Sequence, residues 1–346
     1  MGEAMSDTPI LEVKGLRKHF PIKRGVFRRT VGWIRAVEDV SFYLRQGQTL
    51  GLVGESGCGK TTLLHSLVRL VPPTGGNILY SHGARQIDVT TADANELKIV
   101  RRQMRMIFQD ESALDPRMTV RRIVAEPLRA NLKLKAGELE DRLAQLMVTV
   151  ELTPEHLNWY PHALSGGQRQ RIGIARALTL NPLVLLADEP TSAMDASVQA
   201  QILNLLLTLQ RELHLAVLFV SHDLSVIRHV SDRLAVMYLG RIVEAGDRTA
   251  IFCRPLHPYT EALLSGMPQP DPHRPVKRTA LEGGVPSTTE IPRGCPFHPR
   301  CGYRQTVCER EQPRLQLMAN DQREAACHYA GQLELKGTSA LEEDSS

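Results

Sequence analysis

The segment from Gly51 to Leu70, GLVGESGCGKTTLLHSLVRL, constrains the fold of this chain more than any other. It contains G-x-x-x-x-G-K-T from Gly54 to Thr61, directly after an apolar run. Glycines let successive backbone N–H groups point at phosphate oxygens, and the helix that follows adds the positive end of its dipole. The pattern therefore predicts a strand, a phosphate-binding loop and a helix, as in α/β nucleotide-binding folds.

Two residues of this loop have individual roles in such a site. Lys60 is expected to reach the terminal phosphates, and the Thr61 hydroxyl to bind Mg²⁺. The other residues expected to contact nucleotide here are Gly54, Glu55, Ser56, Gly57, Cys58, Gly59 and Thr62.

A second strand, in the segment PLVLLADEP from Pro182 to Pro190, ends in two acids. A continuous apolar run of this kind is typical of a strand buried on both faces of a parallel sheet, and ligands bind at the carboxyl edge of such sheets. Asp188 is suited to contact Mg²⁺ through water. Glu189 is suited to act as the general base that polarises an attacking water.

Two further polar residues follow apolar strands at the same expected edge. His222 ends the run LAVLFVSH and is expected to contact the γ-phosphate. Gln109 follows MRMIF and is expected to sense Mg²⁺ and the attacking water. Together with Glu189, they form the predicted catalytic set; Gln109 is also counted with Thr61 and Asp188 as a Mg²⁺ contact.

The segment LSGGQRQRIGIARAL, from Leu164 to Leu178, predicts a helix whose N-terminus is a second anion-binding device. Ser165, Gly166 and Gly167 open this helix. The chain thus has two predicted phosphate-binding sites, a glycine-rich loop and the N-terminus of this helix.

With these motifs, the chain resembles an ABC-type ATPase. The motifs that carry the resemblance occur in the family's order as Walker A, Q-loop, signature, Walker B, D-loop and switch histidine: Gly54–Thr61, Gln109, Leu164–Gln168, Leu185–Glu189, Ser192–Asp195 and His222. The resemblance implies a head-to-tail dimer in which one subunit's signature completes the ATP site of the other. Residues assigned to this second half are Ser165, Gly166, Gly167, Gln168 and Asp195. Phe20 stands where the family has an adenine-stacking tyrosine.

The fold class implied is a P-loop NTPase with a RecA-like core, an N-terminal antiparallel β-subdomain and a helical subdomain that carries the signature. The expected ATP-binding domain spans residues 8–250, with the helical subdomain at about residues 110–180. The sequence contains no internal repeat, so we expect one nucleotide-binding domain and not two.

Composition limits the classes of function. The 42 basic and 38 acidic residues give a net charge of +4, which makes no case for nucleic-acid binding. No apolar run reaches the roughly 18 residues of a membrane span, and the first residues lack a signal peptide. We therefore expect a cytosolic chain, in which a disulfide framework is not favoured.

Residues 251–330 resemble the C-terminal extension of oligopeptide/dipeptide importer ATP-binding subunits, through HPYTEALL and GCPFHPRC. Four cysteines crowd this region: Cys295, Cys301, Cys308 and Cys327. The resemblance implies a [4Fe–4S] cluster. Zinc, with His298 and His328 nearby, and four unligated thiols are the alternatives. Residues 331–346 are predicted to be a disordered tail.

The function implied is the ATP-hydrolysing subunit of a bacterial importer of di- and oligopeptides, peripheral at the cytoplasmic face of the inner membrane. Its implied partners are a second ATP-binding subunit, paralogous or identical, two membrane permeases and a separate extracytoplasmic substrate-binding protein. Nickel chelates or oligosaccharides are alternative cargoes. A soluble ABC ATPase of DNA repair is the alternative of another class, but it needs a large insertion between Lys60 and Ser165 that this chain lacks.

Overall fold

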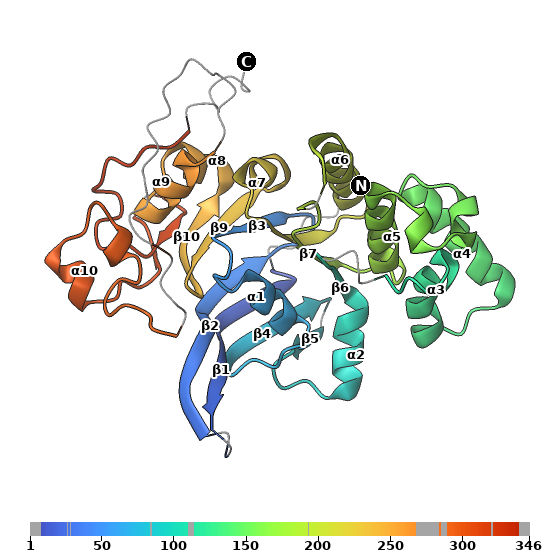
Figure 1. Ribbon diagram of the computed structural model, residues 1–346, viewed down its shortest axis with the longest axis horizontal. Helices are drawn as coiled ribbons and strands as arrows, with labels where there is room; N and C mark the ends of the chain where they lie inside the picture. Colours follow the sequence, from blue (N-terminus) through green and yellow to red (C-terminus); the bar gives the residue numbers. More distant parts are fainter. Residues whose placement is uncertain are drawn as a thin grey trace.

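The computed structural model describes residues 8–25, 27, 29–83, 85–109, 114–192, 194–267, 284, 289–319 and 321–338. Two sheets form its centre, with a group of helices at one end and the C-terminal segments at the other (Figure 1). This arrangement confirms the predicted α/β core with an N-terminal antiparallel sheet.

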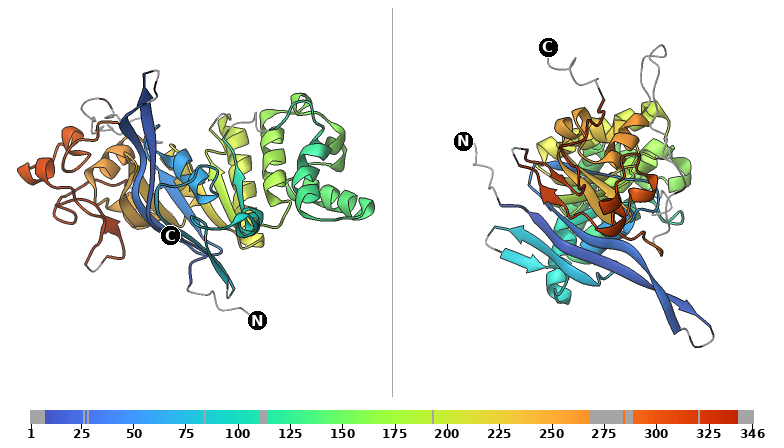
Figure 2. Two further views of the ribbon diagram at one scale, coloured as in Figure 1. Left: turned by 90° about the horizontal axis from the view of Figure 1, so that it is seen from below. Right: turned by 90° about the vertical axis from the view of Figure 1, so that its left-hand side faces the viewer.

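The antiparallel sheet has four strands in the order β2-β1-β4-β5. Its strands are β1 (Leu11–Arg24), β2 (Arg29–Leu44), β4 (Gly75–His82) and β5 (Arg85–Asp88). Strands β1 and β2 pair along almost their whole length, and their far end projects from the body (Figure 2). Buried residues are interspersed with more exposed ones in the inner parts of the two strands, residues 11–18 and 36–44, whereas residues 21–24 and 29–35 at the projecting end are exposed or half-buried.

The larger sheet has eight strands in the order β11-β12-β10-β9-β3-β8-β7-β6. The parallel part consists of β3 (Thr49–Val53), β6 (Met104–Ile107), β7 (Val184–Asp188), β8 (Ala216–Val220) and β9 (Arg233–Tyr238). Every residue of β3, β7 and β8 is buried, as their apolar sequences predict. Because these strands run in one direction, the loops after them meet at one edge of the sheet.

Helices cover this sheet and extend beyond it. Those beside the sheet are α1 (Lys60–Leu67), α2 (Ala94–Gln103), α6 (Ala196–Glu212) and α7 (Leu224–Val230). The helical group at one end contains α3 (Val120–Asn131), α4 (Ala136–Thr149), the 3-10 turns η2 (Pro154–Asn158) and η3 (Pro161–Ala163), and α5 (Gly166–Leu178). Apolar residues of α3, α4 and α5 share one buried core, so the signature helix is fixed to this group.

The C-terminal segments lie against the larger sheet and add strands to it. They contain α8 (Arg248–Cys253), α9 (Pro258–Ser265), η4 (His298–Arg300), α10 (Thr306–Arg310), β11 (Gln316–Leu317) and β12 (Glu324–Ala325). Strand β12 pairs with β10 (Arg241–Asp247), itself antiparallel to β9. The chain after residue 250 therefore continues the main sheet.

Residues 331–338, the first part of the expected disordered tail, have defined contacts in the structure. Residues 331–338 lie against α8 and α9: the Lys336 N–H donates to Glu261 Oε1 at 2.8 Å, and the Thr338 N–H donates to the Phe252 carbonyl at 2.8 Å. These backbone bonds fix a segment whose polar composition alone favours disorder. The rest of that prediction, residues 339–346, lies outside the described residues.

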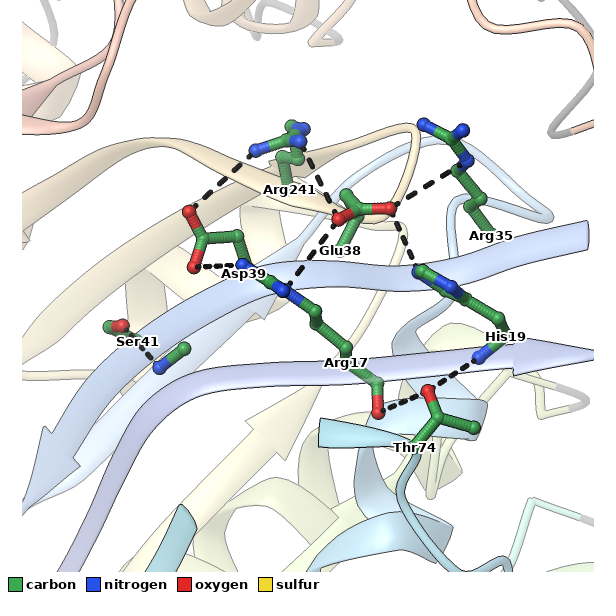
Figure 3. Close-up of polar contacts among 9 residues, drawn as sticks. Arg17, His19, Arg35, Glu38, Asp39, Ser41, Thr74 and Arg241 are labelled. Atoms are coloured by element: carbon green, nitrogen blue, oxygen red, sulfur yellow. Dashed lines mark hydrogen bonds and ion pairs between the residues drawn. The ribbon is translucent and has the colours of Figure 1, made fainter. Parts of the chain in front are cut away.

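A group of charges joins the two sheets around Glu38, whose side chain is only 10% exposed (Figure 3). Its carboxylate lies 2.8 Å from His19 Nε2 and within 4 Å of Arg17, Arg35 and Arg241. Arg241 belongs to β10, whereas the others belong to β1 and β2. This network helps to fix the antiparallel sheet against the larger sheet, beside the loop of residues 54–61.

Candidate functional site

The phosphate loop runs from the end of β3 to the start of α1, as predicted. Gly59 has φ +108°, and a Cβ atom there would lie 1.9 Å from the Ala36 carbonyl oxygen. A Cβ atom at Gly54 would lie 2.2 Å from the Met237 carbonyl oxygen. The backbone of β2 and β9 thus approaches so closely that only glycine fits at these two positions.

Lys60 is the first residue of α1, and it is buried at 5% exposure. Its ammonium donates to the Gly54 carbonyl at 2.7 Å and to the Glu55 carbonyl at 3.2 Å. The loop's own carbonyls therefore hold this cation in the curve that the loop makes. A triphosphate there would meet a preplaced positive charge and the N-terminus of α1.

A cavity of about 530 Å³ lies over this loop and brings part of the loop together with the three predicted catalytic residues. Its lining residues are Ile34, Ala36, Ser56, Gly57, Gly59, Lys60, Thr61, Thr62, Gln109, Glu189 and His222. They come from the antiparallel sheet, the phosphate loop, and the loops that follow β6, β7 and β8. The volume and the mixed lining suit a nucleotide.

Asp188 and Thr61 form the part of the site suited to a divalent cation. Thr61 Oγ1 donates to Asp188 Oδ1 at 3.3 Å, and Asp188 is 2% exposed. Burial raises the pKa of Asp188, while the hydrogen bond from Thr61 partly opposes that rise. Carboxylate and hydroxyl oxygens are ligands that Mg²⁺ prefers.

Glu189 links the other polar residues at the sheet edge. His222 Nδ1 lies 2.9 Å from Glu189 Oε2, and Gln109 Nε2 donates to the same oxygen at 3.2 Å. Glu189 has φ +43°, an uncommon backbone conformation for a residue with a side chain, which turns it out of the strand direction of Asp188. A carboxylate with a histidine and an amide on one oxygen can accept a proton from a bound water.

The predicted second half of the site lies elsewhere in the protomer. Ser165 is the N-cap of α5, where its Oγ accepts from the Gln168 N–H at 3.2 Å. Asp195 is the N-cap of α6 and is exposed. Among the described residues that line the cavity, none of Ser165, Gly166, Gly167, Gln168 or Asp195 is present.

Five predicted nucleotide contacts are also absent from the cavity lining: Phe20, Gly54, Glu55, Cys58 and Asp188. Cys58 is 2% exposed and faces the core, and burial raises the pKa of its thiol. Phe20 pairs with Ile34 across β1 and β2, and the Lys18 ammonium lies 4.7 Å from its ring centroid. In this protomer Ile34 and Ala36 of β2, which the sequence analysis did not single out, line the cavity instead.

The four late cysteines lie around one small cavity of about 20 Å³, with His298 and His328 also in its lining. Burial raises the pKa of Cys295 to about 12 and that of Cys327 to about 11. The donor set suits a metal centre, but no three His, Cys, Asp or Glu side chains of the described chain stand in a metal-holding arrangement. The space is near that of one water molecule, so a four-iron cluster requires the thiols to move apart.

Sequence reasoning missed two residues that contact the phosphate loop. Arg300, just before Cys301, forms an ion pair with Glu55 at 2.7 Å, and the Tyr259 hydroxyl accepts from the Glu55 N–H at 2.9 Å. Both belong to the C-terminal motifs noted above, but no local signal shows that those motifs reach the loop.

Comparison with known proteins agrees with this geometry. Residues 37–192 match the ABC transporter family, and residues 243–308 match the C-terminal region of oligopeptide/dipeptide transporters. The oligopeptide transport ATP-binding protein AppF of Bacillus subtilis is 46% identical over 329 residues, covering 94% of this chain and 98% of AppF. The chain belongs to the ABC transporter ATP-binding proteins.

A second relative of this ABC ATPase is the di/tripeptide transport ATP-binding protein DppF of Pseudomonas aeruginosa. It is 45% identical over 326 residues, covering 93% of this chain and 98% of DppF. As a member of this family, the protein binds and hydrolyses ATP.

Solved structures share the ABC cassette fold. A dimeric bacterial ABC transporter cassette superimposes with a TM-score of 0.60 at 29% identity, covering 69% of this chain and 98% of that one. A component of an ABC transporter complex from Clostridium perfringens gives 0.59 at 27% identity, covering 70% and 90%. The described helices of this ABC protein include none that is both long and apolar enough to cross a membrane.

Proposed function

We propose that this ABC ATPase powers the uptake of di- and oligopeptides across the bacterial inner membrane, from its cytoplasmic face. Support comes from the match of residues 243–308 to the oligopeptide/dipeptide transporter C-terminal region and from the names of its peptide-transport relatives. The observation that carries the chemical part is the contact of Glu189 with both His222 and Gln109 at the mouth of a lysine-containing loop.

We propose the following roles within one ATP site. Lys60 and the loop N–H groups hold the β- and γ-phosphates, and Thr61 and Asp188 position Mg²⁺ between them. Glu189 orients and deprotonates the attacking water, with Gln109 and His222 placing its carboxylate and contacting the γ-phosphate. Phe20 stacks on the adenine when the site closes.

The second half of each site is proposed to come from another subunit, identical or paralogous. Ser165 and Asp195 are exposed N-caps, so both helix N-termini are open to a neighbouring molecule. Backbone N–H groups at Gly166 and Gly167 can then meet a γ-phosphate held by the partner's loop. ATP bound between two protomers would join them, and hydrolysis would release them.

The permease partners are proposed to dock in a groove of about 260 Å³ between the end of β6 and helix α5. Its lining includes Phe108, which is 40% exposed, Leu114, Arg169 and Gly173. Family resemblance implies that a permease docks on the loop of residues 110–120, of which residues 110–113 lie outside the described residues. The groove adjoins Gln109, so a permease there could sense the γ-phosphate side of the site.

We propose that residues 251–330 form a C-terminal extension of the ATP-binding domain, which spans residues 8–250. We also propose that the four thiols of this extension bind a metal centre. An iron–sulfur cluster is implied by family resemblance, and the common cavity of the four thiols supports a shared ligand. Its binding would release protons, because burial favours the protonated thiols. We propose a stabilising role for this centre.

The transport proposal is tested with membrane vesicles that contain the cognate permeases and binding protein. ATP-dependent accumulation of labelled di- or oligopeptide, lost when Glu189→Gln protein replaces the wild type, is expected. Accumulation of a nickel chelate or an oligosaccharide in place of peptide would overturn the cargo assignment.

A further inference from the structure

We propose that Arg300, in the C-terminal part of the chain, is a positioning residue of the phosphate loop that acts through Glu55. Arg300 ends the η4 turn, and Glu55 is the second residue of the loop. Arg300 Nη1 donates to Glu55 Oε2 at 2.7 Å, and Nη2 donates to Oε1 at 2.9 Å. The two groups thus form a bidentate pair across 245 residues of sequence.

The surroundings of this pair shield it from solvent. The Arg300 side chain is 6% exposed and that of Glu55 is 21% exposed. A guanidinium in this environment fixes both oxygens of its partner, whereas a lysine ammonium would fix one point. Such a pair is strongly oriented, and loss of one partner leaves a poorly solvated charge behind.

A second contact from the C-terminal part holds the backbone of the same residue. The Tyr259 hydroxyl accepts from the Glu55 N–H at 2.9 Å. Tyr259 is fully buried, and its ring packs on Tyr238 and Phe297 at centroid distances of 4.6 Å and 5.4 Å. Segments outside the ATPase core therefore fix both the backbone and the carboxylate of Glu55.

The position of Glu55 matters because its carbonyl oxygen helps to hold Lys60. The same residue that meets Arg300 through its side chain accepts from Lys60 Nζ through its backbone. Displacement of Glu55 would move a support of the cation that faces the triphosphate. The structure thus connects Arg300 to Lys60 through one intervening residue.

Arg300 also neutralises a negative charge beside an anion-binding loop. Ser56, the residue after Glu55, lines the nucleotide cavity, whereas the Glu55 carboxylate is turned toward Arg300. Without Arg300, this carboxylate would stand unpaired next to a loop that must accept a triphosphate. Repulsion between like charges would then weaken ATP binding.

In the described part of the chain, Arg300 contacts Glu55 and faces the Tyr238 ring, and it contacts none of Glu189, Gln109 or His222, which we assign to the chemical step. We therefore expect Arg300 to affect ATP binding and not the rate of the chemical step. Loss of Arg300 should raise KM and the dissociation constant for ATP while kcat changes little, because ground state and transition state lose the same interaction.

The experiment uses the full-length protein in four forms: wild type, Arg300→Gln, Arg300→Gln with Glu55→Gln, and the control Arg310→Gln at an exposed position of α10. ATP affinity is measured with a fluorescent ATP analogue, and KM and kcat by phosphate release. We expect about ten-fold weaker ATP binding for Arg300→Gln, because the variant loses one charge interaction near the loop. Arg310→Gln should bind ATP as the wild type does. The double variant should bind ATP more tightly than Arg300→Gln alone, because the unpaired carboxylate is gone.

Wild-type affinity in folded Arg300→Gln, or a double variant at least as weak as Arg300→Gln, would overturn the proposal. If Arg300→Gln does not fold, as judged by circular dichroism, Arg300→Lys carries the test. It keeps the cation but loses the second hydrogen bond, so its affinity should fall by a few fold with kcat retained. Unchanged affinity in Arg300→Lys would then contradict the bidentate role. Failure of wild-type protein itself to bind ATP would instead refute the assigned ATPase activity.

Discussion

His222 and Glu189 are hydrogen-bonded partners: Nδ1 of the histidine lies 2.9 Å from Oε2 of the glutamate. The two residues leave neighbouring strands, β8 and β7, at the same edge of the sheet. Gln109, beyond β6, donates to the same carboxylate oxygen. Three loops therefore converge on one group, and that group is the best candidate for handling the proton of the attacking water.

Replacement Glu189→Gln should abolish ATP turnover and preserve ATP binding. The amide cannot accept the water's proton, so we expect kcat to fall by roughly 100-fold or more. Phosphate release measures turnover, and size-exclusion chromatography with ATP should show an accumulated dimer. The control Glu212→Gln, exposed at the end of α6, should behave as wild type. Unchanged phosphate release by Glu189→Gln would remove its role as general base.

Replacement Lys60→Ala should weaken nucleotide binding itself. It removes the buried ammonium held by the Gly54 and Glu55 carbonyls, so ATP affinity should fall by about ten-fold or more. Titration with a fluorescent ATP analogue measures this loss. Lys98→Ala, at an exposed position of α2, is the matched control. Equal affinity in Lys60→Ala and wild type would contradict the assigned phosphate contact.

A mixing experiment tests whether two chains share each ATP site. Lys60→Ala and Ser165→Asn proteins should each have little activity, yet a mixture should regain part of it. Mixed dimers contain one site in which the lysine and the serine are both intact. Asparagine preserves the N-cap of α5, so folding is retained. If the mixture never exceeds the sum of its components in an ATPase assay, the shared site is wrong.

Glu244 should make stability depend on pH. It is fully buried, its oxygens accept from the Leu256 and His257 N–H groups, and burial raises its pKa to about 7 despite these bonds and the nearby Arg323. The folded state therefore holds its proton at pH values where the unfolded state has lost it. Stability from this group is present below about pH 4.5 and is lost as pH rises to about 7, by on the order of 3 kcal/mol.

Denaturant unfolding at several pH values measures this effect. Glu244→Gln does not titrate at this position, so its unfolding free energy should fall less between pH 5 and about 7 than that of wild type. The exposed Glu309→Gln should retain the wild-type slope. Parallel slopes in Glu244→Gln and wild type would show that Glu244 is ionised throughout.

Anaerobic purification should yield a brown protein that absorbs in the blue, if the four late thiols hold the proposed iron–sulfur cluster. Cys308→Ser should remove the colour, because Cys308 lines the shared cavity. Cys253→Ser should keep it, because Cys253 is not among the thiols that line that cavity. A colourless wild-type protein containing zinc would refute the cluster, and one free of metal would refute any metal centre.

Much of the cassette could be predicted because the relevant signals are local. Apolar runs that end in Asp188 and His222 indicate buried parallel strands, and parallel strands place their ends together. The convergence of Glu189, Gln109 and His222 follows from that rule. A glycine pattern likewise indicates the loop without knowledge of its surroundings.

Contacts between distant segments could not be predicted in this way. Nothing near Arg300 shows that its guanidinium pairs with Glu55, because the pair depends on how the C-terminal part packs on the core. Strand β12 has only two residues, too few for a periodic pattern, yet it joins the main sheet. Residues 331–338 were misjudged for the same reason, since their backbone bonds go to α8 and α9.

The short pairing of β12 with β10 has a consequence for shortened forms of the protein. The Ala326 N–H donates to the Val243 carbonyl at 2.8 Å, so residues 324–326 cover the edge of β10. Cleavage after residue 250 would leave that rim with open donors and acceptors, a template for self-association. A proteolytic fragment that ends near residue 250 would therefore be prone to aggregate even with its catalytic residues intact.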